Sequence, residues 1–253
     1  MRSVLVEIGG FTLYSYGAML LLAFVLGLFF ILREAPRKGF DTDYIYEAFI
    51  ISIVLAVLGS RITYVLLNWE LYEGEHLIKT MFARETGLTF YGGLIAVFMG
   101  LFVHCYFRKI PFLKLMDFAA PFIALGYGIT RIGCFLNGCC YGHTTTLPLG
   151  VSFPLVDGLP RHPTQLYAVL AGLVIFVLLR YMRKYSFFDG YIFLFFFIFY
   201  GAYRFVVEFF RVSEPVLWVL TPAQLMALLF IVAALSLYYW KRNRAFLMTG
   251  KEH

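Results

Sequence analysis

Long apolar runs separated by short polar or basic segments recur along the whole chain. A helix needs roughly 20 mostly apolar residues to cross a bilayer, and seven of these runs come near that length. Since helices satisfy their own backbone hydrogen bonds in lipid, we predict an all-α integral membrane protein, a bundle of seven transmembrane helices. The predicted spans are residues 14–32, 48–67, 87–107, 118–136, 164–179, 190–210 and 221–240.

The cations in the loops alternate between the two sides of these spans, and this predicts the orientation. The cations that follow the first, third, fifth and seventh spans are Arg33, Arg37, Lys38, Arg108, Lys109, Lys114, Arg180, Arg183, Lys184, Lys241, Arg242, Arg244 and Lys251. The opposite loops carry only Arg2, Lys79, Arg84 and Arg161. The positive-inside rule therefore places the N-terminus outside and the C-terminus in the cytoplasm.

Composition agrees with a membrane protein. The chain is 61% hydrophobic and 14% charged, whereas a soluble domain carries about 25% charged residues. We predict one transmembrane domain over residues 1–253, with outer loops near 68–86 and 137–163 forming a small head and no cleavable signal peptide. The net charge of +6 follows from the cytoplasmic loops, so it gives no support to a nucleic-acid partner.

Four arginines lie inside or at the end of predicted spans: Arg61, Arg131, Arg204 and Arg211. Spans two, four and six run outward, so their arginines lie in the outer half of the bilayer. One interpretation is that they reach the outer headgroups or pair internally, since Glu208 is one helical turn from Arg204 and Arg211. Cations at this depth usually face a cavity, and a guanidinium matches phosphate oxygens. We therefore predict a phosphate-binding cavity for a phospholipid headgroup.

Three more motifs lie at the same predicted level. YSYG contains Tyr16, and FYGG contains Tyr91, Gly92 and Gly93; paired glycines let another helix or a ligand approach the backbone closely. The loop motif RHPTQLY contains His162, and an imidazole can exchange protons near neutral pH. In the same motif, the threonine after the proline is predicted to cap the fifth helix.

Three cysteines lie at the end of the fourth span or just after it: Cys134, Cys139 and Cys140. Their spacing differs from the common paired C-x2-C zinc pattern, although His143 makes a fourth potential metal ligand. A disulfide between Cys134 and Cys139 is another possibility. We interpret the cysteines as small buried packing residues or as a stabilising disulfide, and we predict no metal and no cofactor.

The motifs occur in an order that resembles a known family. YSYG, GSRITY, YGG, GITRIGCFLNGCCYG, RHPTQLY and YGAYRFVVEFFR are similar to those of prolipoprotein diacylglyceryl transferases, over nearly the whole chain. The resemblance implies a seven-helix enzyme of the bacterial inner membrane with two substrates, phosphatidylglycerol and a preprolipoprotein. It would move the diacylglyceryl group onto the lipobox cysteine, form a thioether and release glycerol phosphate.

The resemblance also implies roles for individual residues. Arg131 and Arg204 match phosphate-contacting arginines. The other matching or neighbouring positions, expected to bind substrate, are Tyr16, Arg61, Gly92, Gly93, Asn137, Gly142, Tyr200, Glu208 and Arg211.

Three positions depart from the family pattern. Well-known relatives have histidine at Tyr91, asparagine at Cys134 and glutamate at Cys139. The base that would deprotonate the acceptor thiol is therefore open: Tyr91, His162, or water in a cationic cavity.

Two further functions fit the same pattern of spans. The chain could be a paralogue that transfers a phospholipid-derived group to another acceptor. It could also be a membrane thiol or metal protein that uses Cys134, Cys139 and Cys140. A transporter or channel fits less well, because the spans show no inverted repeat and their cations lie in the outer half.

Overall fold

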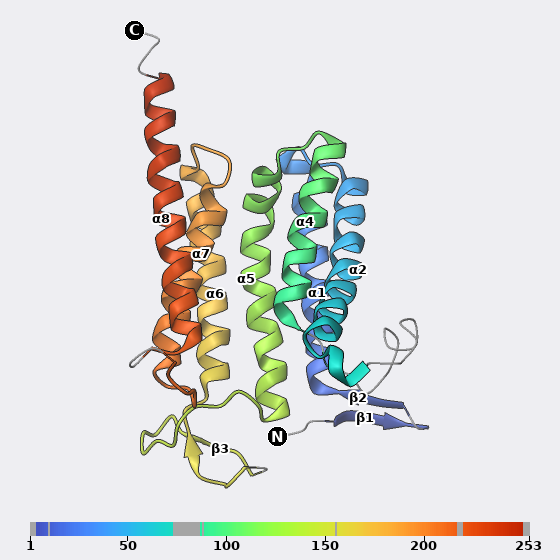
Figure 1. Ribbon diagram of the computed structural model, residues 1–253, viewed down its shortest axis with the longest axis vertical. Helices are drawn as coiled ribbons and strands as arrows, with labels where there is room; N and C mark the ends of the chain where they lie inside the picture. Colours follow the sequence, from blue (N-terminus) through green and yellow to red (C-terminus); the bar gives the residue numbers. More distant parts are fainter. Residues whose placement is uncertain are drawn as a thin grey trace. The chain divides into compact units, whose positions relative to one another are not determined.

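The computed structural model describes residues 4–9, 11–72, 87, 89–154, 156–216 and 220–249. Seven of its helices are long and apolar enough to cross a membrane, which confirms the predicted number of spans (Figure 1). They are α1 (Ser15–Glu34), α2 (Thr42–Leu67), α4 (Phe90–Arg108), α5 (Phe112–Asn137), α6 (Thr164–Met182), α7 (Tyr191–Glu208) and α8 (Pro222–Thr249).

Two helices begin earlier than the apolar pattern predicts. α2 begins at Thr42 because the Asp41 carboxylate accepts a hydrogen bond from the backbone N–H of Asp43 at 3.1 Å and so caps its first turn. α5 begins at Phe112 and continues through Pro121, which is buried inside the helix.

Short strands flank the helices, and the helical periodicity did not predict them. β1 (Val4–Ile8) pairs with β2 (Phe11–Tyr14) as an antiparallel hairpin that leads directly into α1. β3 (Val151–Ser152) pairs with β4 (Pro160–Arg161) in the loop before α6. Three short 3₁₀ segments, Pro36–Lys38, Trp69–Tyr72 and Arg183–Tyr185, connect or extend helices.

The chain divides into two compact units. One unit comprises residues 31–112, and the other comprises residues 1–30 and 113–253. Of the outer head predicted at 68–86 and 137–163, the described part contains the 3₁₀ segment Trp69–Tyr72 and the β3–β4 pair, whereas residues 73–86 lie outside the described residues. Arg2, Lys79, Arg84 and Lys251, which entered the charge count, also lie outside them.

In the unit of residues 31–112, α2 and α4 lie side by side (Figure 1). Their contact depends on small residues: a Cβ added to Gly92 of α4 would lie 2.1 Å from Thr63 Oγ1 and 2.6 Å from the Gly59 carbonyl oxygen of α2. A Cβ on Gly93 would lie 2.3 Å from Ser60 Oγ. Helices in lipid associate by close van der Waals packing, so these glycines hold the two backbones together.

In the larger unit, α5, α6, α7 and α8 pack through similar close contacts. α7 and α8 lie side by side (Figure 1). The Asp117 carboxylate of α5 accepts hydrogen bonds from the backbone N–H groups of Gly190, at 2.7 Å, and Phe193, at 2.8 Å. These donors lie at the start of α7, where four backbone N–H groups lack a partner within the helix. Asp117 therefore fixes α7 against α5.

We predict that Gly92→Ala destabilises the protein by about 1–3 kcal/mol, the usual cost of overpacking a tight contact. The added methyl group meets the backbone of α2, which cannot move aside as a flexible side chain would. Thermal unfolding of the purified protein in detergent measures the change.

Gly27→Ala is the matched control, because an added Cβ on that residue of α1 meets nothing within 4 Å. Its unfolding temperature should stay equal or rise slightly, since alanine favours a helix over glycine. Equal unfolding temperatures for the two variants would contradict the packing role of Gly92.

Candidate active site

A buried carboxylate organises the cations at the end of α7. Glu208, which is 5% exposed, has its Oε2 2.9 Å from Arg204 Nη1 and 4.0 Å from Arg211 Nε. Its other oxygen accepts a hydrogen bond from Ser213 Oγ at 2.7 Å. The internal pairing considered for Arg204 is therefore present, and Arg211 lies at the outer limit of ion-pair distance from the same carboxylate.

A short segment after α5 is fixed between two other parts of the chain. The Gly142 N–H donates to the His162 carbonyl at 2.9 Å, and the His143 N–H donates to the Phe210 carbonyl at 2.9 Å. A Cβ on Gly142 would lie 2.1 Å from the Phe210 carbonyl oxygen. Only glycine allows this approach, so Gly142 brings the end of α5 beside Arg211, with which it forms an antiparallel bridge.

Arg131 and Arg211 line one small cavity in the larger unit. Arg131 comes from α5 and its guanidinium lies 4.9 Å from the centre of the Tyr127 ring. In the described part of the chain, Arg131 forms no ion pair with a carboxylate, in contrast to Arg204 and Arg211. The complete lining is Tyr127, Arg131, Cys140, Thr164, Gln165, Ala168, Tyr203, Val207 and Arg211.

Tyrosines surround the guanidinium of Arg131. Tyr127 meets Tyr200 edge to face, with ring centres 5.4 Å apart, and meets Tyr203 at 6.3 Å. Tyr16 of α1 lies close to the same group: a Cβ on Gly133 of α5 would be 3.0 Å from the Tyr16 Cα, and the Tyr16 phenol interacts electrostatically with Arg131. Tyr16 and Tyr200, both predicted to be near the site, are thus near Arg131.

The start of α6 supplies polar side chains that the sequence analysis did not assign to the site. Gln165 Nε2 donates to the Cys139 carbonyl at 2.6 Å, and Thr164 Oγ1 donates to the Cys140 carbonyl at 2.5 Å. The prediction that Thr164 caps α6 was wrong: its hydroxyl donates to the preceding loop instead. Gln165 Oε1 is buried without a hydrogen-bond partner in the described structure.

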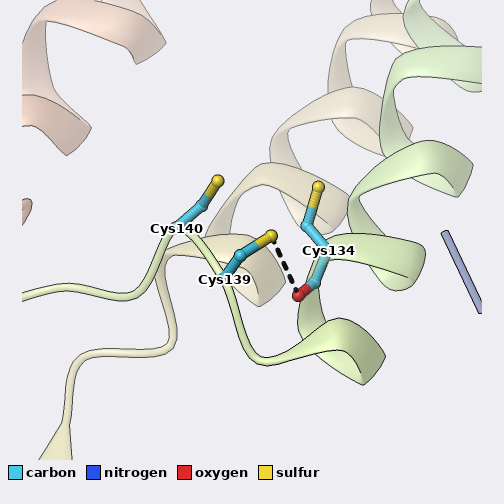
Figure 2. A group of neighbouring side chains, drawn as sticks. All are labelled: Cys134, Cys139 and Cys140. Carbon is cyan, nitrogen blue, oxygen red and sulfur yellow. Dashed lines mark hydrogen bonds between the residues drawn. The ribbon is translucent and has the colours of Figure 1, made fainter. Parts of the chain in front are cut away.

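Cys134, Cys139 and Cys140 form a cluster beside the cavity (Figure 2). All are free thiols, so the disulfide considered between Cys134 and Cys139 is absent, and their sulfur atoms lie within 4.8 Å of one another. Asn137, the last residue of α5, makes a side-chain hydrogen bond to Cys139. It therefore belongs to this cluster.

The two loop thiols have opposite tendencies to ionise. Burial raises the pKa of the Cys139 thiol. The pKa of Cys140 is held below its usual range, first by a hydrogen bond from the Cys134 thiol and then by one from Cys139. The positive charges of Arg131 and Arg211 lower it further. The cationic side of the cavity thus favours a thiolate at Cys140.

His162 does not line the cavity. Its Nδ1 lies 3.1 Å from the Tyr167 hydroxyl, and its ring packs 5.1 Å from the ring of Phe210. Its backbone carbonyl accepts the hydrogen bond from Gly142. The structure therefore places His162 in the loop network that supports the cavity.

The remaining predicted residues belong to the unit of residues 31–112. Arg61 is 5% exposed and its guanidinium lies over the rings of Tyr64 and Tyr72, at 5.9 and 5.8 Å. Tyr91 is 56% exposed. Gly92 and Gly93 are buried against α2, so of the two partners considered for them, helix or ligand, the structure shows the helix.

This arrangement suits an anion whose charge increases during a reaction. Two guanidinium groups in a tight, partly apolar cavity stabilise such charge more than water does. Arg131 has aromatic rings but no described carboxylate as its neighbour, so its charge is available to a ligand. A phosphate group matches this geometry and charge.

Comparison with known proteins agrees with this chemistry. The model of the prolipoprotein diacylglyceryl transferase family matches residues 3–240. Three similar proteins are each named phosphatidylglycerol–prolipoprotein diacylglyceryl transferase. The protein from Geobacter sulfurreducens is 38% identical over 79% of this chain and 77% of its own length. The protein from Clostridium tetani is 33% identical over 83% of this chain and 86% of its own length. The protein from Streptococcus equi subsp. equi is also 33% identical, over 94% of this chain and 94% of its own length.

We predict that Glu208→Gln destabilises the protein by about 1–3 kcal/mol, because it leaves two guanidinium groups without their shared counter-charge. Breaking a fully buried pair costs more, but the side chains of Arg204 and Arg211 are 21% and 23% exposed and water screens them in part. Unfolding temperature, with activity measured in parallel, tests the prediction.

Glu214→Gln is the matched control, since Glu214 is exposed just beyond the same segment. This variant should unfold like the wild type. Similar losses in both variants would show that the effect of Glu208→Gln does not come from the ion pair.

Proposed function

The chain belongs to the prolipoprotein diacylglyceryl transferase family, and we propose that it transfers the diacylglyceryl group of phosphatidylglycerol to the lipobox cysteine of preprolipoproteins. The observation that carries this proposal is the cavity that Arg131 and Arg211 line together. It supports binding of the phosphate of phosphatidylglycerol, which would leave as part of glycerol phosphate.

The proposal includes the place of the reaction. With seven apolar helices, the protein is a multi-pass membrane protein. We propose that this is the bacterial plasma (inner) membrane, with the N-terminus outside and the C-terminus in the cytoplasm, because of the distribution of loop cations. This orientation puts the ends of α5 and α7, and thus the cavity, near the outer leaflet, where a secreted substrate arrives.

In the proposed reaction the acceptor thiolate attacks the glyceryl carbon that carries the phosphate. An S–C bond forms and the C–O bond to phosphate breaks, with its electron pair remaining on glycerol phosphate. The phosphate gains negative charge as it leaves, and Arg131 and Arg211 would stabilise that charge. Arg204 is oriented by Glu208 and would contribute at longer range.

The proton of the acceptor thiol must leave before or during the attack, because the thiolate is the nucleophile. Tyr91 and His162 are the side-chain candidates for the base. His162 is engaged with Tyr167 away from the cavity lining. We therefore favour ionisation of the thiol by the positive charge of the cavity, with water accepting the proton.

The other residues expected at a substrate site belong to the unit of residues 31–112. Arg61, Gly92 and Gly93 are expected to bind substrate, and Tyr91 stands where well-known relatives have histidine. Among them, Arg61 is the strongest candidate for a second lipid contact, because it is a buried cation on a span. The small packing contacts of Gly92 and Gly93 support an indirect role.

Arg131→Ala and Arg211→Ala should each lower kcat by about 10²–10³, the usual effect of removing one preorganised donor to a developing negative charge. The assay uses purified protein with phosphatidylglycerol and a lipobox peptide, and mass spectrometry detects the added diacylglyceryl group. A peptide with serine in place of cysteine is the substrate control.

Arg37→Ala, which removes an exposed arginine from the 3₁₀ segment Pro36–Lys38, should retain wild-type turnover. Wild-type turnover in Arg131→Ala would overturn the assignment of the cavity. A well-folded wild type that never modifies the cysteine peptide would favour the paralogue with another acceptor.

Tyr91→Phe and His162→Ala should keep the rise of kcat/KM with pH, because the ionisation of the acceptor thiol controls it. The measurement is the pH–rate profile of each variant beside the wild type. Loss of the rising limb in one variant would identify that side chain as the base and contradict our preference for water.

A further inference from the structure

The cysteine cluster after α5 has a geometry that packing alone does not require. Cys134 lies in the last turns of α5, and Cys139 and Cys140 follow the helix. Figure 2 shows the three side chains with their sulfur atoms directed to the same side. All three sulfurs lie within 4.8 Å of one another.

These separations are close to those of a metal–thiolate site. A point equidistant from three atoms at that upper limit is about 2.8 Å from each, and Zn–S bonds are about 2.3 Å long. In a tetrahedral site each sulfur would therefore move by about 0.6 Å to bind one ion. Side-chain rotation alone supplies shifts of this size.

The backbone is shaped to bring neighbouring sulfurs together. Side chains of adjacent residues in an extended chain point in opposite directions. Here Gly138 and Cys140 both adopt left-handed conformations, with φ of 72° and 64°, and the chain turns so that Cys139 and Cys140 face the same side (Figure 2). A left-handed conformation is unfavourable for a residue other than glycine, so the surrounding contacts must maintain it.

Those contacts come from the helices on either side. The Cys139 N–H donates to the Cys134 carbonyl at 3.1 Å, which ties the loop to α5. The hydrogen bonds from Thr164 and Gln165 fix the Cys140 and Cys139 carbonyls to α6. The three sulfurs are thus held by rigid elements before any ligand binds, as a metal site requires.

The charge around the cluster fits an anionic metal centre. Three thiolates and one Zn²⁺ carry a net charge of −1. Arg131 and Arg211 line the same cavity as Cys140, so two guanidinium groups lie near the place that such an anionic centre would occupy.

We propose that Cys134, Cys139 and Cys140 bind one Zn²⁺ ion as a three-thiolate site. Soft thiolate ligands favour zinc or copper(I) among the common metals, and zinc binds without any change of oxidation state. This inference does not rest on the proposed transferase activity.

The site leaves one position of the zinc tetrahedron open, because the described His, Cys, Asp and Glu residues supply no fourth atom to the group. Zinc sites with three protein ligands and an open position are typical of catalysis. Cys140 belongs to both the cluster and the cavity lining, so the cluster adjoins the cavity. We infer that an incoming thiol completes the site, and this second part rests on the proposed function.

Metal analysis of the full-length protein, purified under reducing conditions without chelator, tests the zinc site. We expect about one zinc per chain in the wild type and in Cys105→Ser, a matched control whose sulfur contacts Tyr44 in the other unit. Cys134→Ser, Cys139→Ser and Cys140→Ser should each lose most of the bound zinc.

A second measurement on the wild type avoids variants that fail to fold. Chelation should lower the unfolding temperature, and added Zn²⁺ should restore it, since a ligand that binds only the folded state stabilises it. Absence of zinc together with an unfolding temperature that does not respond to either addition would overturn the site. One copper(I) per chain in place of zinc would contradict the identity of the metal. A disulfide between Cys134 and a loop cysteine in unreduced membranes would contradict the metal site and indicate a redox pair.

Cobalt(II) substitution separates the two parts of the proposal. A lipobox peptide should increase the sulfur-to-cobalt charge-transfer absorption, and its serine analogue should not. An unchanged spectrum would overturn the thiol-binding part and leave the zinc site intact. Neither readout requires turnover, so failure of the transferase assay is a separate result.

Discussion

The buried carboxylate of Glu208 is the interaction on which the cationic end of the larger unit depends. A membrane-embedded unit cannot bring guanidinium groups together unless an opposite charge offsets their repulsion and desolvation. Glu208 contacts Arg204 and Arg211 through one oxygen and Ser213 through the other. Arg131 has no such partner in the described structure, so it retains the free charge that a phosphate can use.

Backbone contacts bring the two cations to one cavity. The Gly142–Arg211 bridge ties the end of α5 to the segment after α7, and the space at Gly142 is too small for any other side chain. In lipid, buried N–H and C=O groups need partners, and the loop segments around Gly142 satisfy one another. The same hydrogen bonds thus stabilise the loops and position the arginines.

Apolar length was sufficient to predict the spans, because the bilayer thickness fixes it. The start of α2 was missed because a cap at Asp41, not an apolar residue, begins that helix. At the site, all four arginines were predictable as costly intramembrane charges, but the predicted phosphate pair was Arg131 and Arg204, whereas Arg131 and Arg211 line the cavity. Gln165 was missed, since a polar residue at the start of a helix is usually a surface residue. The sequence also did not show that Gly92 packs against α2, because that contact depends on how the two helices pack.

The cysteines show most clearly what spacing cannot reveal. C-x4-C-C differs from common zinc patterns, and adjacent cysteines normally diverge. The left-handed backbone at Cys140 reverses this expectation, and hydrogen bonds from Thr164 and Gln165 hold the carbonyls of that loop. Those two residues also line the cavity. The same two side chains therefore contact both the loop that carries Cys139 and Cys140 and the cavity that Arg131 and Arg211 line.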